Sequence, residues 1–85
     1  MPFYKITIAR TAQKQLDKLP DSLAERLITA IYDLAENPRP HGYKKLKGYD
    51  AYRVRSGDYR IIYEIFDKAL VINVVALGHR RDIYN

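Results

Sequence analysis

The segment Ala51–Tyr63, AYRVRSGDYRIIY, constrains the fold of this chain more than any other part of it. Two runs of alternating side chains flank Ser56–Asp58, and a glycine-containing turn between such runs is typical of a β-hairpin. Because side chains alternate between the two faces of a strand, Arg53 and Arg55 must share a face. A two-residue loop places Arg60 on that face in either register that it allows, whereas a three-residue loop would turn Arg60 away.

The two faces of this hairpin differ in chemistry. One carries the side chains that we expect in a hydrophobic core: Tyr52, Val54, Tyr59, Ile61 and Tyr63. The other carries the three arginines, and like charges that lie opposite each other in a sheet cost roughly 0.2–1 kcal/mol. A bound phosphate would offset this cost, because a guanidinium donates two parallel hydrogen bonds to phosphate and stays charged. The arginine face therefore favours phosphate binding, and a solvated charged face is the alternative.

The charge of the whole chain points to the same class of partner. Its 85 residues include 15 Lys and Arg against 10 Asp and Glu, a net charge of +5. Residues 1–38 carry as many acidic as basic side chains, so the entire excess lies in residues 39–85. A basic half of this kind predicts an anionic partner, with nucleic acid first and an acidic protein second.

Length and composition narrow the class of protein further. A chain of this size suits one small domain, so we expect a single domain over residues 1–85. The absence of cysteine excludes a disulfide, a thiolate nucleophile and a cysteine-based metal site, and we expect no metal or other cofactor. The longest apolar run is too short to span a bilayer, and the N-terminus lacks a signal-peptide pattern. These features predict a cytoplasmic protein with no membrane partner.

The elements before the hairpin follow from periodicity and capping signals. Phe3–Ile8 alternates and is rich in β-forming residues, which predicts a strand. Thr11 can cap a helix over residues 12–19, which Pro20 ends. Ser22–Glu25 matches a capping box, so a second helix should run to about Glu36, antiparallel to the first. Its buried stripe is formed by Leu23, Leu27, Ala30, Ile31 and Leu34.

Two more strands should follow the first strand of the hairpin. Residues 59–66 and 70–77 have strand character, and a two-residue turn at Asp67-Lys68 would join them. That turn would place these pairs on the core face: Ile61 with Val74, Tyr63 with Ile72, and Ile65 with Leu70. The element order β-α-α-β-β-β predicts an α+β fold, in which an antiparallel sheet packs one face against the helix pair. The arginine face stays open, together with the other side chains that alternate onto it: Ile62, Glu64, Phe66, Val71, Asn73 and Val75.

Residues 37–49 form a loop in which basic side chains are interleaved with tyrosines. In proteins that bind single-stranded RNA, cations meet the phosphates and aromatic rings stack on the bases. We therefore expect the substrate to contact Tyr43, Lys44, Lys45 and Lys47. The alternative is a solvated loop whose tyrosines pack back on the core. Beyond the last strand, we expect the side chains of Gly78–Asn85 to emerge next to the hairpin.

Four segments together resemble the RelE/ParE superfamily of toxins from type II toxin–antitoxin pairs. They are Lys45–Gly48 (KLKG), Tyr52–Arg55 (YRVR), Gly57–Tyr63 (GDYRIIY) and Gly78–Tyr84 (GHRRDIY). Their order and spacing resemble those of the family over nearly the whole chain. The GDYR strand and the GHR ending are more similar to the RelE branch than to the ParE branch.

The resemblance implies a toxin that enters the ribosomal A site, cleaves the mRNA there and inhibits translation. In the implied reaction, which uses no metal ion, the ribose 2′-hydroxyl attacks the adjacent phosphate. This chemistry needs in-line positioning, charge stabilisation at the phosphate, a base for the 2′-hydroxyl and an acid for the leaving oxygen. The implied partners are the ribosome, its mRNA and a cognate antitoxin protein that covers the basic face.

The resemblance also implies the catalytic residues, position by position. Arg60 matches the arginine that stabilises the phosphate, Arg80 the arginine that stabilises the leaving group, and Tyr84 the tyrosine that stacks on or orients the substrate. Arg53 and Arg55 match catalytic positions that are lysines in the best-known member. Arginine does not give up its proton in proteins, so these two residues suit phosphate clamping and not base catalysis.

The general base is the open position in this mechanism. A histidine titrates near neutral pH, which makes His79 the first candidate, followed by Tyr84, Glu64 and His41. Two other functions are compatible with the same residues. One is a ParE-like inhibitor that binds DNA gyrase without cleaving nucleic acid, and the other is a degenerate toxin that acts only through its antitoxin.

Overall fold

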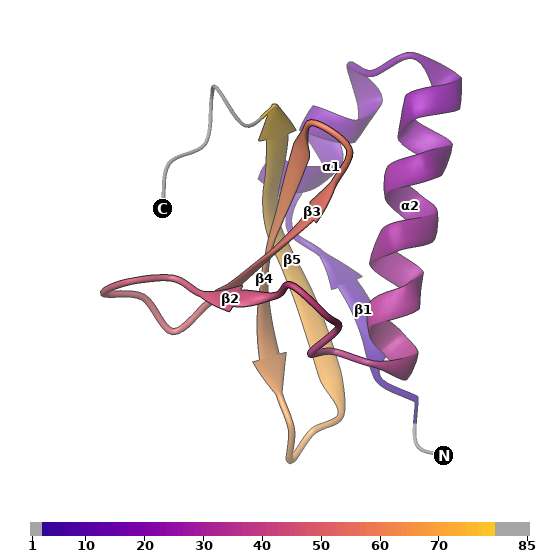
Figure 1. Ribbon diagram of the computed structural model, residues 1–85. Helices are drawn as coiled ribbons and strands as arrows, with labels where there is room; N and C mark the ends of the chain where they lie inside the picture. Colours follow the sequence, from indigo (N-terminus) through magenta and orange to yellow (C-terminus); the bar gives the residue numbers. More distant parts are fainter. Residues whose placement is uncertain (1–2, 80–85) are drawn as a thin grey trace.

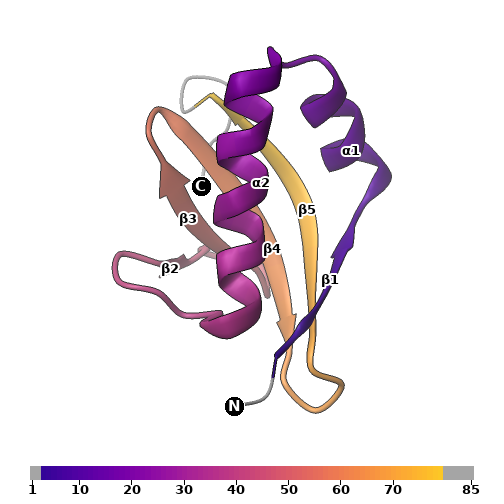
Figure 2. The same ribbon diagram turned by 90° about the vertical axis from the view of Figure 1, so that its right-hand side faces the viewer.

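In the computed structural model, which describes residues 3–79, two helices cover one face of a five-stranded sheet (Figures 1 and 2). The elements are β1 (Lys5–Ile8), α1 (Arg10–Asp17), α2 (Asp21–Glu36), β2 (Lys44–Lys45), β3 (Tyr52–Ser56), β4 (Tyr59–Phe66) and β5 (Val71–His79). Across the sheet the strands follow the order β1-β5-β4-β3-β2. The predicted α+β class and the order of the main elements are confirmed.

The sheet departs from the expected one at both edges. Strand β1 pairs with β5 in parallel, with Ile6 opposite Ile72, so the sheet is mixed. Because β3, β4 and β5 form an antiparallel meander, one edge of β5 stays open, and β1 occupies that edge. At the other edge, Lys44 and Lys45 form the short strand β2 within a segment that the sequence analysis treats as a loop.

Both helices begin earlier than the capping signals predict. Helix α1 follows Ala9 and α2 follows Pro20, and neither helix has a side-chain cap. The predicted caps at Thr11 and Ser22 are therefore wrong. In α2 the Pro20 carbonyl accepts hydrogen bonds from the N–H groups of Leu23 and Ala24. Pro20 is therefore the N-cap residue: its ψ of 147° is not helical, and the helix starts at the next residue, Asp21.

The hairpin of β3 and β4 has the two-residue loop on which the arginine argument depends. Ser56 pairs with Tyr59 and Arg55 pairs with Arg60, which leaves Gly57 and Asp58 as the loop. Gly57 has a φ of +62°, a conformation that glycine adopts without steric cost. The pairing puts the three arginines on one face of the sheet, as the sequence predicts.

The register predicted for β4 and β5 is wrong. The loop between them spans residues 67–70, so Tyr63 pairs with Val74 and Ile65 pairs with Ile72. Leu70, expected in the core, is 38% exposed and has a φ of +55°. Across this loop the Asp67 carbonyl accepts a 3.3 Å hydrogen bond from the Leu70 N–H.

A β-bulge in β5 changes which side chains face the helices. Ile62 pairs with Ala76 and Tyr63 pairs with Val74, so Val75 is the extra residue. Beyond a bulge the alternation of side chains is inverted. Leu77 consequently faces the helices and is fully buried.

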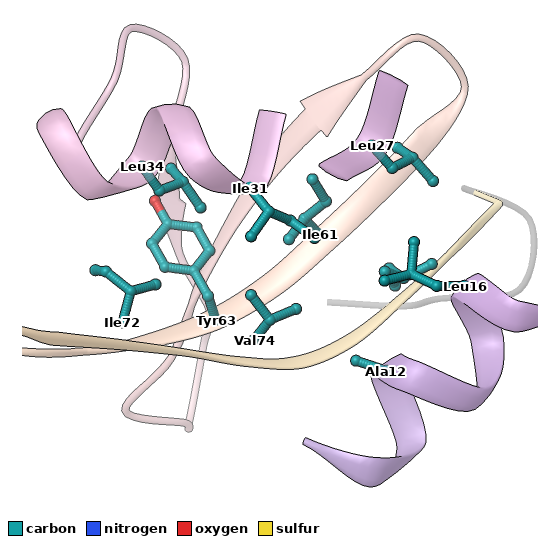
Figure 3. Packing of buried hydrophobic residues seen from close by; sticks show 10 residues of the cluster. Ala12, Leu16, Leu27, Ile31, Leu34, Ile61, Tyr63, Ile72 and Val74 are labelled. Atoms are coloured by element: carbon teal, nitrogen blue, oxygen red, sulfur yellow. The ribbon is translucent and has the colours of Figure 1, made fainter. Parts of the chain in front are cut away.

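The core lies between the helices and the sheet (Figure 3). Leu27, Ile31 and Leu34 of α2 lie over Ile61 and Tyr63 of β4, and Leu16 of α1 completes the cluster near the end of β5. The buried stripe predicted for α2 is confirmed at these three positions. The ring of Tyr63 is wholly buried, and its hydroxyl donates a 2.7 Å hydrogen bond to the Pro38 carbonyl. Burial raises the pKa of Tyr63, so this donor is retained at physiological pH.

A cluster of polar side chains ties the segment after α2 to the loop between β4 and β5 and to the residue before β1. Asp67 accepts two hydrogen bonds from Arg39, at 2.9 and 3.3 Å, and one from the Tyr4 hydroxyl at 2.6 Å. The hydrogen bonds from Arg39 and then from Tyr4 lower the pKa of Asp67. Together with the Tyr63–Pro38 bond, this cluster fixes the course of the chain that leads into β2.

The helix–sheet core predicts a large effect of truncating α2. Leu27 is fully buried, so Leu27→Ala should lower the free energy of unfolding by roughly 2–5 kcal/mol through lost burial and a cavity. Its neighbour Ile28 is 37% exposed, and Ile28→Ala, the control, should change stability by only about 0.5 kcal/mol. Urea denaturation measures both values. Equal effects of the two substitutions would contradict the assignment of the buried face.

The Asp67 cluster predicts a pH dependence of stability. The pKa of Asp67 is lower in the folded than in the unfolded chain. The ionised carboxylate therefore contributes to folding stability at pH values above its pKa in the unfolded chain. That contribution is lost as the pH falls through its pKa in the folded chain. Asp67→Asn should therefore lower the melting temperature at pH 7 but flatten its decline toward pH 2. Circular dichroism melts at low salt measure this difference. Parallel curves for the two proteins would show that the cluster contributes nothing.

Candidate functional site

One face of the sheet is turned away from the helices (Figure 1). The strand register places four basic residues from β2, β3 and β4 on it. Residues directly opposite one another in an antiparallel pair share a face. In one row across the sheet, Lys44 lies opposite Arg53, which lies opposite Ile62. In the next row Arg55 lies opposite Arg60. We name Lys44, Arg53, Arg55 and Arg60 the cationic cluster.

The spacing within the cationic cluster suits a phosphate backbone. Neighbouring strands lie about 4.8 Å apart, and residues two apart along a strand are separated by about 6.7 Å. The four cations are thus concentrated in a small patch, where several of them can contact the same phosphodiester group. Such a patch attracts nucleic acid electrostatically without regard to sequence.

Arg53 is the most constrained member of the cluster. Its side chain is only 4% exposed, and its Nε has no hydrogen-bond partner among the residues that the structure describes. Burial lowers the pKa of Arg53, and repulsion from Arg60 and Arg55 lowers it further. A buried cation without a counter-charge is destabilising, and an anion would remove that penalty.

A pocket of about 270 Å³ opens beside Arg53 and Arg55. His41, Gly42 and Lys44 form its other walls with Val54, and none of these lining residues is acidic. The pocket therefore offers hydrogen-bond donors and positive charge, the two features that bind a phosphate group.

The other half of the open face is apolar. Leu46 and Ala51, which flank the turn between β2 and β3, bury Ile62 together with Val75 and Ala76. Beside them lies a second pocket of about 370 Å³, which we name the apolar pocket. Leu46, Ala51, Ile62 and Val75 form its walls, and Tyr49, Asp50 and Glu64 stand around it.

Glu64 is held in place by a chain of hydrogen bonds. The Asn73 amide donates a 3.1 Å bond to Glu64 Oε1 and accepts a 2.9 Å bond from the Thr7 hydroxyl at its Oδ1. These contacts link β4, β5 and β1 on the open face. The carboxylate is thereby oriented beside the apolar pocket.

Other residues named from the sequence do not join the cationic cluster. His79 pairs with Tyr59 beyond the bulge and therefore lies toward the helices, where the two rings meet edge to face with centroids 5.6 Å apart. His79 thus lies next to the hairpin, as expected, but on the side that faces the helices and away from the cationic cluster. Lys45 pairs with Tyr52 and so faces the same way as the core.

Two more residues from the basic loop have positions of their own. Tyr43 packs its ring against Tyr52, with centroids 5.8 Å apart, as in the alternative in which the tyrosines pack back on the protein. Lys47 is exposed in the turn after β2. Arg80 and Tyr84 lie outside the described residues.

The apolar pocket was not predicted from the sequence. The one indication of this pocket in the sequence is a pair of apolar residues, Leu46 and Ala51, on either side of a polar turn. With β2 treated as a loop, nothing indicated that these two side chains would fold over Ile62. Within residues 3–79, no helix is long and apolar enough to cross a membrane, and no three His, Asp or Glu side chains gather as a metal site.

Comparisons with known proteins agree with this architecture. The family model of the ParE toxin of the type II toxin–antitoxin system parDE matches residues 6–84. The mRNA interferase toxin RelE of Escherichia coli K12 is 31% identical over 91% of this chain and 83% of its own length.

Solved structures show the same fold. The toxin–antitoxin complex RelBE2 from Mycobacterium tuberculosis matches with a TM-score of 0.86 and 26% identity, covering 94% of both chains. The archaeal RelE–RelB complex from Pyrococcus horikoshii matches with a TM-score of 0.80 and 33% identity, covering 92% of this chain and 96% of the other. This chain therefore belongs to the RelE/ParE superfamily of type II toxins, on its RelE-like branch.

Proposed function

We propose that this protein is a ribosome-dependent mRNA endonuclease that cleaves mRNA in the ribosomal A site and so inhibits translation. The cationic cluster carries the proposal, because it holds a buried arginine without a counter-charge in the described structure. Its similarity to a toxin named mRNA interferase supports the same reaction. Free mRNA is flexible, and the ribosome would supply the positioning of the reacting groups.

In the proposed mechanism a general base takes the proton of the ribose 2′-hydroxyl, and its oxygen attacks the adjacent phosphate. The P–O5′ bond breaks and the leaving oxygen takes up a proton from solvent, so that a 2′,3′-cyclic phosphate and a 5′-hydroxyl result. Arg60 stabilises the charge that develops on the phosphate oxygens, while Arg53 and Arg55 clamp the phosphodiester. Arg80 stabilises the leaving oxygen and Tyr84 orients the substrate.

The geometry favours His41 as the general base. Of the candidates raised by the sequence, His41 lines the same pocket as Arg53 and Arg55, whereas His79 faces the helices. A neutral imidazole has a ring nitrogen that can accept the proton of the 2′-hydroxyl. Glu64 is also on the open face, beside the apolar pocket.

We further propose that a cognate antitoxin covers the open face. Both structural relatives described above are complexes of a RelE-type toxin with its antitoxin. Acidic groups of such a partner would neutralise the cationic cluster, and its apolar groups would fit the apolar pocket.

A second candidate function is gyrase inhibition without nuclease activity. The family model that matches this chain is that of ParE, and arginines stand where a general base would be expected. In that case the cationic cluster would serve only to bind a target protein. Single substitutions would then weaken inhibition gradually across the cluster, and no mRNA would be cut.

Removing Arg60 tests the endonuclease. In a purified translation system, Arg60→Ala should reduce cleavage of mRNA on ribosomes by about 10²–10³-fold, because one stabilising group for the phosphate is lost. Primer extension detects the cuts, which should also disappear when ribosomes are omitted. In cells the same substitution should abolish growth inhibition.

The control for this experiment is Arg10→Ala, since Arg10 is exposed at the start of α1. It should cleave like the unaltered protein. Melting temperatures of both variants should stay close to that of the unaltered protein, because neither residue belongs to the core. Full cleavage by Arg60→Ala, or none by folded unaltered protein, would contradict the proposal.

Removing Arg53 tests the cost of the cationic cluster. Arg53→Met keeps a long side chain but removes a buried charge, so the free energy of unfolding should rise by about 1 kcal/mol at low salt. Inorganic phosphate should stabilise the unaltered protein more than the variant. Urea denaturation with and without phosphate measures both effects. A less stable variant would show that Arg53 is a structural residue with satisfied contacts.

A further inference from the structure

We propose that the apolar pocket receives one nucleobase of the RNA whose phosphates bind the cationic cluster, and that it prefers a base with an exocyclic amino group over uracil. The inference rests on the proposed RNA binding and adds the recognition of a base. The two halves of the open face differ in chemistry. One half is cationic, and the other combines apolar walls with two carboxylates.

The two halves are close enough to hold parts of one nucleotide or of two consecutive ones. Arg53 and Ile62 lie directly opposite each other on neighbouring strands, and Ile62 is a wall of the apolar pocket. Strand spacing places these two backbones about 5 Å apart. A phosphate at Arg53 therefore leaves its ribose and base within reach of the pocket.

The walls of the pocket suit the flat, weakly polar face of a base. Leu46, Ala51 and Ile62 are buried together and present aliphatic groups. Tyr49 stands at the rim with 69% of its surface exposed, so its ring is available for stacking on a base. The volume of about 370 Å³ is ample for a nucleobase.

The carboxylates decide which edge of the base fits. Asp50 and Glu64 offer only acceptors when ionised, and amino groups of cytosine, adenine and guanine are donors. Uracil presents carbonyl oxygens on both sides of its ring N–H, and these oxygens would face the carboxylates. Because Asn73 and Thr7 hold Glu64 in place, it cannot turn aside without losing the 3.1 Å hydrogen bond.

A basic side chain of a protein partner is the competing occupant. Its cation would satisfy the carboxylates, but it would approach next to Arg53 and Lys44, which repel it. A nucleotide carries its own anion to these cations while its amino group meets the carboxylates. Charge complementarity over the whole open face therefore favours the nucleotide.

Binding of two trinucleotides to the protein alone tests this inference. Tricytidylate and triuridylate have the same size and charge and differ in the groups on their base edge. Fluorescence anisotropy at low salt should show about tenfold tighter binding of tricytidylate. Glu64→Gln should bring this ratio close to one, mainly by strengthening the binding of triuridylate, because an amide can donate to a uracil oxygen. Asp50→Asn should act in the same direction.

Two variants separate base recognition from charge. Arg53→Met should weaken both trinucleotides equally and leave their ratio unchanged. Glu36→Gln removes an exposed carboxylate at the end of α2 and should change neither the affinities nor the ratio.

The outcomes also distinguish this inference from the proposed nuclease. A cytidine preference that depends on Glu64, in a protein that never cuts mRNA on ribosomes, would support the pocket and reject the enzyme. Ribosomal cleavage together with equal binding of the two trinucleotides, or with no binding of either, would overturn the pocket. The pocket would also be overturned if Glu64→Gln left the ratio of the two trinucleotide affinities unchanged. The same conclusion would follow if Glu64→Gln no longer bound an antitoxin peptide while the two trinucleotides bound equally well.

Discussion

The pairing of β3 with β4 across a two-residue loop is the constraint on which the rest of the structure depends. It sets Arg55 opposite Arg60 and Arg53 opposite Ile62, so one face of the hairpin is cationic and the other supplies Ile61 and Tyr63 to the core. A slip of one residue would exchange these faces. It would bury the arginines under α2 and expose the core, which makes the register strongly determined by hydrophobic burial.

The open face holds an unfavourable arrangement of charge. Arg53 is buried near two other arginines, and burial and their repulsion both oppose its charged form. The helix–sheet core on the opposite face supplies the stability that tolerates this arrangement. The segment into β2 is held by the Tyr63–Pro38 bond and by Arg39 on Asp67, and it brings Lys44 and His41 to the cluster. The cationic cluster on the open face thus depends on the helix–sheet core and on hydrogen bonds outside the cluster.

Much of the site was accessible from the sequence because it rests on local alternation. The three arginines, their common face and the turn at Gly57 follow from the period of a strand and the chemistry of a short loop. The buried stripe of α2 follows from helical periodicity in the same way. Where local signals competed, prediction failed: Ser22 matches a capping box, but the helix starts at Asp21, directly after Pro20, whose carbonyl accepts its first hydrogen bonds.

The sequence by itself determined the α+β class, the hairpin with its cationic face and the amphipathic helix, since each depends on neighbours within a few residues. Only the tertiary structure decided the parallel docking of β1, the bulge at Val75 and the folding of Leu46 and Ala51 over Ile62. Consequently it also decided that His79 faces the helices, that His41 lines the pocket beside Arg53 and Arg55, and that Glu64 lines the apolar pocket. These features arise from contacts between segments far apart in the chain. Burial of the core stabilises the structure by more than local conformational preferences do, and such contacts leave no periodic pattern in the sequence.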